Sequence, residues 1–251
     1  MHRFYLSPND WSAATLTGSE AHHARSVLRL QPGARVTLFD GQGREGTAEI
    51  TALDSAAVQL RILHEAVTSP LRARITLAQA IPKGKNMDLI VQKAVEIGAA
   101  EIFPLLSART VVHLDSESAA QKQTKWQTVA LEAAKQCGQN WLPQVHTPRT
   151  PNVFFAATGA TSYDLRLIGS LQPGAFHLKK ILAEYAGAHA GARPAKVLIL
   201  VGPEGDFTPA EIALGRSHGC APLTLGPIIL RVETAAIYCL SILSYELLAE
   251  S

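Results

Sequence analysis

The chain has 251 residues, 47% of them hydrophobic, so it is long enough to bury a substantial core. Its formal net charge of +2 excludes a protein that binds nucleic acid through overall basicity, and any basic surface must be local. The sequence has neither a basic, apolar leader nor an apolar run of the roughly 18 to 20 residues that a membrane span needs. We therefore expect a cytoplasmic protein of two domains with no membrane partner.

The first 70 residues contain short extended runs separated by glycine turns. Strands are expected at 35–39, 46–53 and 57–63, and the sequence DGQGREG supplies the glycines of a hairpin turn. This pattern is typical of a small β-barrel, and we predict such a domain over residues 1–70.

After residue 70 the pattern changes to alternating strands and helices. This change predicts an α/β domain over residues 74–251 with a mainly parallel sheet. Strands are expected at 74–81, 101–106, 163–168, 196–201 and 222–225. Helices are expected at 86–97, 118–137 and 175–185, with a further helix beginning near Thr208 and an apolar helix at the C-terminus.

The sequence VGPEGDFTPAEI, residues 201–212, continues directly from the apolar strand at 196–201. Its TPAE portion has the pattern of a helix-capping box with proline at the first helical position. Gly202 and Gly205 therefore lie in a loop at the carboxyl end of a strand, where α/β sheets bind ligands. Because Glu204 and Asp206 disfavour an anion, we predict a neutral or cationic ligand held by backbone groups. An ordinary strand-to-helix turn is the alternative.

A second glycine turn lies in LTLGPIILRVETAAIYCL, residues 223–240. It places Arg231 and Glu233 at the start of the apolar C-terminal helix. A core helix explains most residues of this segment, but it does not explain an arginine and a glutamate at the helix start.

These two stretches resemble the signature of the RsmE family, the 16S ribosomal RNA uridine-N3 methyltransferases of the SPOUT superfamily. The stretches AHHARSVLRLQPG, AQAIPKGKNMDLIVQKAVEIGAAEIFPLLSART and KWQTVALEAAKQCGQNWLPQV agree with the family in the same order along the chain. The resemblance implies a PUA-like β-barrel followed by a SPOUT α/β domain with a deep trefoil knot. It also implies S-adenosylmethionine (SAM) as cofactor, a homodimer, and 16S rRNA in the small ribosomal subunit as partner.

The resemblance also implies roles for single residues. The expected SAM-binding residues lie in the two glycine turns and the preceding strand: Leu200, Gly202, Pro203, Glu204, Gly205, Leu225, Gly226, Ile229 and Leu230. Arg231 is expected to stabilise a uridinate, whereas Glu233 is a base, a partner of Arg231 or a helix cap. The expected RNA contacts are Arg3, His23, Arg25, Arg29, Lys83, Lys85 and Arg109. The three cysteines form no CxxC pair, and we expect no metal site.

The sequence departs from the family at two positions where arginine is common, which here hold Gln139 and Ile228. These departures leave two alternatives open. One is a SPOUT enzyme that acts on another RNA nucleotide, and the other is a non-catalytic RNA-binding or ribosome-assembly protein.

Overall fold

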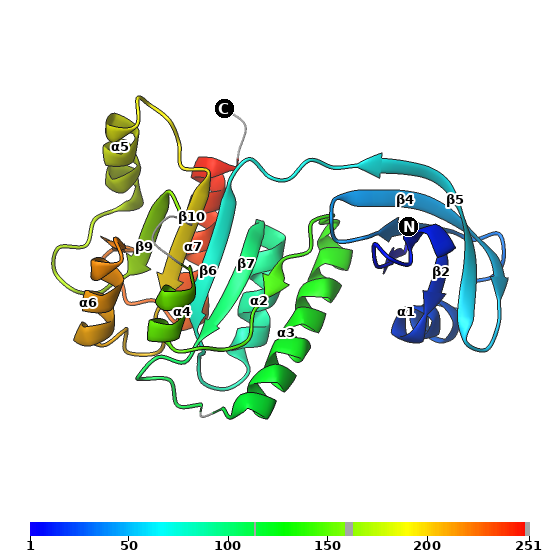
Figure 1. Ribbon diagram of the computed structural model, residues 1–251, viewed down its shortest axis with the longest axis horizontal. Helices are drawn as coiled ribbons and strands as arrows, with labels where there is room; N and C mark the ends of the chain where they lie inside the picture. The colour runs from blue at the N-terminus through cyan, green and yellow to red at the C-terminus, as the bar shows by residue number, and fades with distance from the viewer. Residues whose placement is uncertain (113, 159–162, 249–251) are drawn as a thin grey trace. The chain divides into compact units, whose positions relative to one another are not determined.

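The structure is a computed structural model that describes residues 1–112, 114–158 and 163–248. The chain divides into two compact units (Figure 1). Unit 1 consists of Met1–Pro70 together with Leu131–Leu142, and unit 2 consists of Leu71–Ala130 and Pro143–Ser251. Unit 1 therefore includes a second piece of chain that the predicted boundary at residue 70 leaves out.

Unit 1 is a curled sheet of five strands in the order β1-β3-β4-β5-β2, with short helical segments beside it. The strands are β1 (Arg3–Tyr5), β2 (Thr15–Thr17), β3 (Arg35–Phe39), β4 (Arg44–Leu53) and β5 (Ala57–Val67). The helical segments are η1 (Trp11–Ala13), α1 (Gly18–His22) and η2 (His23–Val27). Alternate side chains of β3 and β4, such as Val36, Leu38 and Ile50, are buried with Phe4 and Trp11 in one core.

Unit 2 is an α/β unit around a six-stranded sheet in the order β11-β9-β10-β6-β7-β8. All its pairings are parallel, which confirms the predicted class. The strands are β6 (Arg74–Ala80), β7 (Ala99–Leu105), β8 (Gln144–Val145), β9 (Leu165–Gly169), β10 (Lys196–Val201) and β11 (Ala221–Leu223). The helices are α2 (Asn86–Ile97), α3 (Ser116–Cys137), α4 (Pro151–Thr158), α5 (Leu178–Ala188), α6 (Pro209–Ser217) and α7 (Val232–Leu247), and the end of α3 from Leu131 belongs to unit 1.

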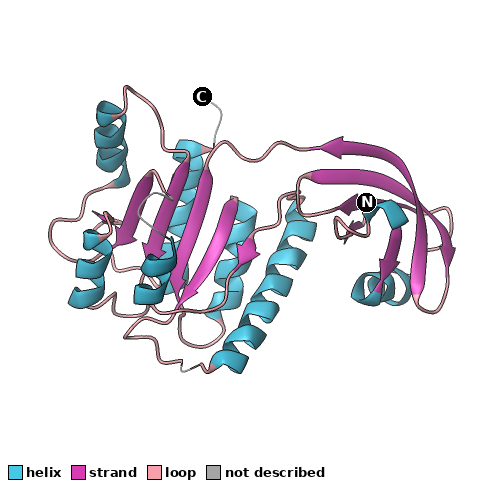
Figure 2. Cartoon of the chain, viewed as in Figure 1, coloured by secondary structure: helices cyan, strands magenta, loops and turns pink. Residues whose placement is uncertain are grey.

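Helices flank the unit 2 sheet on both sides (Figure 2). Leu198 and Leu200 of β10 share a core with Phe154 of α4 and Ile212 of α6, while α7 packs against β6 and β10. The central strand β10 is thus covered on both faces, as expected of its uninterrupted apolar sequence. In the part of the chain that the structure describes, no helix combines the length and apolar character needed to cross a bilayer.

Strands β3 and β10 and helix α2 have the predicted bounds, whereas the other predicted strands and helices begin or end one to four residues away from prediction. Two of these differences, in α5 and β11, have a visible cause. Helix α5 begins at Leu178 instead of residue 175, because the Phe176 N–H donates to the carbonyl of Pro222 at 3.0 Å. Phe176 is thereby held along the edge of β11 and cannot join the helix. Strand β11 itself ends at Leu223 instead of residue 225, before the chain turns at Gly226 with a φ of +108°.

The predicted capping box at the start of α6 is confirmed. The Thr208 hydroxyl accepts from the Glu211 N–H at 3.3 Å, and the Glu211 carboxylate accepts from the Thr208 N–H at 2.9 Å. Pro209 occupies the first helical position. The loop that precedes α6 therefore has a fixed end.

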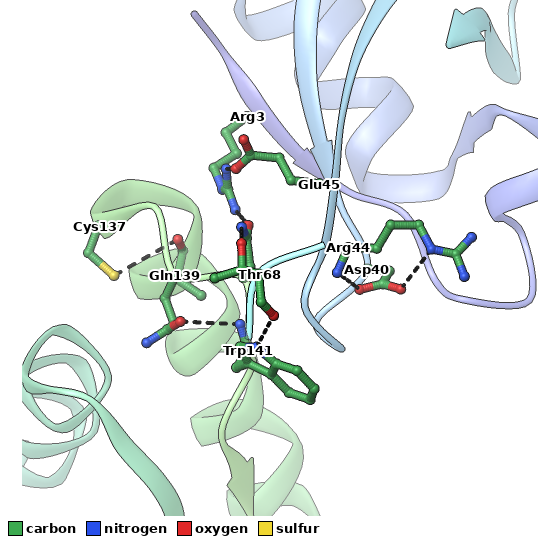
Figure 3. Close-up of polar contacts among 10 residues, drawn as sticks. Arg3, Asp40, Arg44, Glu45, Thr68, Cys137, Gln139 and Trp141 are labelled. Atoms are coloured by element: carbon green, nitrogen blue, oxygen red, sulfur yellow. Dashed lines mark hydrogen bonds and ion pairs between the residues drawn. The ribbon is translucent and has the colours of Figure 1, made fainter. Parts of the chain in front are cut away.

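The segment that follows α3 completes unit 1 (Figure 3). The Gly43 N–H donates to the Asn140 carbonyl, and the Trp141 indole donates to the Thr68 carbonyl at 2.9 Å. Gly43 has a φ of +97°, and a Cβ there would lie 2.6 Å from the Trp141 ring. The indole thus packs where only glycine leaves room, and residues 140–142 are part of the folded unit 1.

Candidate active site

A cavity of about 360 Å³ lies at the carboxyl ends of β9, β10 and β11, which are neighbours in the sheet. Its walls come from the loop after β9, the loop after β10, and the chain from Leu223 into α7. The sequence-predicted ligand residues that line it are Gly202, Pro203, Glu204, Gly205, Leu225, Gly226, Ile229 and Leu230. The structure therefore brings the two glycine turns together around one space.

Leu200, also predicted to contact the ligand, does not line this cavity. Its side chain is 1% exposed and packs in the core with Leu198 and Phe207. Because successive side chains of a strand point to opposite faces, the next residue, Val201, reaches the cavity instead.

The turn after β10, residues 202–207, forms the ligand loop. A Cβ at Gly202 would lie 3.0 Å from the Phe207 nitrogen, so glycine lets the loop close on itself. Gly205 and Asp206 are both left-handed, with φ of +87° and +68°. This conformation is easy for glycine but costs conformational energy in aspartate.

The acidic residues around the ligand loop accept hydrogen bonds from backbone N–H groups of three neighbouring loops. Glu204 accepts from Lys83 at 3.0 Å, and Asp206 accepts from Leu171 at 3.0 Å. Glu211 accepts from Ala108 at 2.8 Å. The three N–H groups follow β6, β9 and β7, respectively. These carboxylates therefore fix loops at the cavity edge, so their presence does not by itself indicate a cationic ligand.

Arg231 and Glu233 point to different surroundings at the start of α7. Arg231 lines the cavity, and its guanidinium forms no hydrogen bond or ion pair with residues that the structure describes. The Glu233 carboxylate accepts from the Asn86 side-chain amide at 3.1 Å and is not part of the cavity lining. The structure thus brings Arg231, but not Glu233, to the cavity.

Two family models match the chain. The model described as RNA methyltransferase domain matches residues 69–244, and the model described as RNA methyltransferase PUA domain matches residues 16–63. The chain belongs to the ribosomal RNA small subunit methyltransferase E family. Similar members are those of Bacillus subtilis, 30% identical over 92% of this chain and 90% of the relative, and of Synechocystis, 31% identical over 96% and 76%.

Solved structures of this family have the same fold. The family member from Neisseria gonorrhoeae bound to S-adenosyl methionine is 31% identical and covers 98% of both chains with a TM-score of 0.83. A methyltransferase from Legionella pneumophila in complex with SAM is 33% identical and covers 97% of both chains with a TM-score of 0.84. The α/β fold with a PUA-like unit is therefore that of the family.

The residues at which this chain departs from the common family pattern lie in different units. Ile228 lines the cavity and is 73% exposed, so an apolar side chain stands at the position where the family resemblance leads us to expect an arginine. Gln139 belongs to unit 1, where its side-chain oxygen accepts from the Trp141 N–H at 3.2 Å (Figure 3).

Three of the cations that the family resemblance assigns to RNA are engaged within their own units. Arg3 contacts Glu45 at 2.5 Å, donates to Asn140 and lies over the Phe39 ring (Figure 3). Arg25 donates to the carbonyls of Asp54 and Ser55, and Arg109 donates to those of Gly205 and Asp206. These guanidinium groups therefore have partners within the protein, and the expected role of the three residues in RNA binding stays a prediction.

The remaining expected RNA residues have fewer contacts. His23 packs edge-on against the Phe4 ring, with centroids 6.0 Å apart. The side chains of Arg29, Lys83 and Lys85 are exposed and have no hydrogen bond or ion pair within the described parts of the chain. These three cations are free to meet an external anion.

Sequence reasoning missed cavity residues in the loop after β9 and on α7. Ser170 and Leu171 follow β9, while Ala235 and Cys239 lie on α7. Burial raises the pKa of the Cys239 thiol to about 12, so it remains a neutral, apolar part of the wall. The predicted strand that ends at residue 168 indicates that Ser170 and Leu171 lie in a loop at a strand end. Only the strand order shows that this loop lies beside the end of β10.

Residues 1–112, 114–158 and 163–248 contain no cluster of three metal-ligating side chains.

Proposed function

We propose that this protein transfers the methyl group of SAM to N3 of a uridine in the 16S ribosomal RNA of the small ribosomal subunit. The observation that carries the proposal is the cavity at the ends of β9, β10 and β11, with the unpaired Arg231 at its edge. Family membership supports it, since the similar proteins are small-subunit rRNA methyltransferases and two solved relatives hold SAM.

The residues of the cavity fit SAM. The volume of about 360 Å³ lies within the roughly 300 to 1,000 Å³ of small-molecule sites. Leu225, Ile229 and Leu230 offer apolar surface for an adenine, and Gly202 and Gly226 allow close approach to the backbone. Because Glu204 and Asp206 already accept backbone N–H groups, their charges are partly compensated before a carboxylate-bearing ligand arrives.

The proposed chemistry requires a uracil that is not base-paired, because N3 carries a proton and is paired in a duplex. When bound, SAM supplies an electrophilic methyl group. To accept that methyl group the uracil would have to lose its N3 proton to solvent, and this loss would place negative charge on the ring. Negative charge that develops on the uracil oxygens is stabilised by the guanidinium of Arg231, whose donors are unpaired. Glu233 holds the start of α7 against Asn86 and is not assigned the role of base.

We also propose that the family's trefoil knot and homodimer occur in this chain. Large side chains on the paired helices α2 and α7 remain exposed, among them Leu89 at 39%, Tyr238 at 46% and Tyr245 at 76%. A second copy would cover this apolar surface. Arg29, Lys83 and Lys85 are proposed to contact RNA phosphates, because their charges are free.

One observation favours a second function, methylation of a different RNA nucleotide. Ile228 presents an apolar side chain to the cavity at the position where the family resemblance leads us to expect an arginine. The two functions differ in the modified nucleoside and not in the cofactor.

The test combines SAM binding by calorimetry with transfer of labelled methyl groups to small ribosomal subunits from cells that lack this gene. We expect SAM binding and 3-methyluridine by mass spectrometry. Arg231→Ala should lower kcat by roughly 10²- to 10³-fold with little change in SAM affinity. Arg216→Ala, which removes an exposed arginine of α6, is the matched control. A different methylated nucleoside would support the second function, and absence of SAM binding would exclude both.

A further inference from the structure

We infer that Arg109 is a positioning residue that holds the ligand loop in its SAM-binding shape, and that it is not an RNA ligand. The inference rests on the proposed function in one respect, namely that the ligand loop binds SAM. It assigns to the loop after β7 a part in cofactor binding, although the described residues of this loop contribute no side chain to the cavity lining.

The contacts of the Arg109 guanidinium converge on the strained part of the ligand loop. Its Nη1 donates to the carbonyl of Gly205 and, at 3.4 Å, to that of Asp206. These are the two consecutive left-handed residues, and Gly205 lines the cavity. A cationic donor that binds both carbonyls favours this conformation over the extended ones that Asp206 would otherwise prefer.

Arg109 is itself presented by a fixed turn. The Thr110 N–H donates to the Ser107 carbonyl at 3.0 Å, and the two hydroxyls of these residues lie 3.0 Å apart. Ser107 is buried, and the Ala108 N–H donates to the Glu211 carboxylate at 2.8 Å. The turn is thus tied to the start of α6, directly after the ligand loop. The backbone that carries the Arg109 side chain is therefore held in place, although the side chain itself is exposed.

The opposite side of the ligand loop is held by Asp206. Its carboxylate accepts from the Leu171 N–H at 3.0 Å and from the Phe207 N–H at 2.8 Å. Arg109 fixes the carbonyls while Asp206 fixes the neighbouring loop, so the cavity wall at Gly205 is restrained from two directions. Without Arg109 the wall loses one restraint, and part of the SAM binding energy must be spent on ordering the loop.

The test measures SAM and RNA binding separately on the full-length protein. Arg109→Ala should raise the Kd and the KM for SAM roughly tenfold, since hydrogen bonds from a charged donor are lost. RNA affinity without SAM, the KM for RNA and the thermal midpoint should stay as in the wild type. Arg109→Lys should restore most of the SAM affinity, because an ammonium can donate to both carbonyls.

Lys85→Ala is the matched control, since Lys85 is an exposed cation without an internal partner. It should leave SAM affinity unchanged and weaken RNA binding. If Arg109→Ala binds SAM like the wild type, or if its main defect is in RNA binding, the inference is overturned. If the wild-type protein does not bind SAM, the proposed function itself fails.

Discussion

At the scale of single residues, Gly202 sets the shape of the cavity wall. Substitution by alanine would place a Cβ 3.0 Å from the Phe207 nitrogen, a backbone atom that cannot move independently of the loop. We expect Gly202→Ala to weaken SAM binding at least about tenfold in calorimetry. The added methyl group would displace the ligand loop, and small displacements of a binding residue have large effects. Gly187→Ala on α5, where a Cβ meets open space, should bind SAM normally and be equal or higher in stability. Equal SAM affinity of both variants would refute this reading of Gly202.

Arg3 is a second residue whose surroundings determine its role. Its side chain is 11% exposed and contacts Glu45, Asn140 and Phe39. Arg3→Ala leaves the side-chain oxygen of the buried Asn140 without its arginine donor, so we expect the free energy of unfolding to fall by about 1–3 kcal/mol in urea titrations. Arg61→Ala, which breaks an ion pair whose arginine is 64% exposed, should change it by less than about 1 kcal/mol. A stable Arg3→Ala variant with weakened RNA binding would instead support the role in RNA contact.

At the scale of elements, Glu101 of β7 links three parts of the unit 2 sheet. Its carboxylate contacts Arg74 of β6 at 2.6 Å and lies 3.3 Å from the His146 ring nitrogen beyond β8. The hydrogen bond with His146, followed by the contacts with Arg74, lowers the pKa of Glu101 from its usual 4.5 against the opposing effect of burial.

A carboxyl group with a lowered folded-state pKa stabilises the fold above its unfolded pKa, and this contribution disappears as the pH falls through the folded value. We therefore expect Glu101→Gln to be less stable than the wild type at pH 6, with the difference shrinking as the pH falls below the usual glutamate pKa of 4.5. Urea midpoints measured at each pH test this expectation. A difference that is independent of pH would show that Glu101 acts by packing alone.

Long elements with regular patterns were predictable from the sequence, whereas elements defined by tertiary contacts were not. The bounds of α2 were predictable from the helical spacing of its apolar residues, and those of β10 from its continuous apolar run. The start of α5 depends on the bond between Phe176 and Pro222, which lie far apart in the chain. Strands as short as β1, β2 and β8 are too brief for periodicity to reveal.

The same distinction applies to the cavity. Glycines and a capping box identified the ligand loop and the turn at Gly226, because these features are local in the sequence. Ser170 and Leu171 became recognisable only from the order β11-β9-β10, which brings their loop beside the ligand loop. The internal partners of Arg3 and Arg109 are equally distant in sequence, so the sequence alone could not predict these contacts.

At the scale of the whole molecule, unit 1 needs residues from two parts of the chain. A fragment of residues 1–70 would lack the Asn140 carbonyl for Gly43 and the Lys135 ammonium, which lies 2.9 Å from Glu20. We expect this fragment to unfold without a cooperative transition in urea. A fusion of residues 1–70 to residues 131–142 through a flexible glycine–serine linker should regain cooperativity. The expectation is wrong if residues 1–70 alone unfold as cooperatively as the fusion.

The divided construction of unit 1 also sets an order of events while the protein is being synthesised. At about 5–20 residues per second, the nascent chain grows from Pro70 to Leu142 in about 4–14 s. Until Leu142 has been synthesised, the turn between β3 and β4 lacks the Asn140 carbonyl that accepts from the Gly43 N–H, so unit 1 is incomplete. Strand β10 begins only at Lys196, so all residues of unit 1 are synthesised before the central strand of the unit 2 sheet.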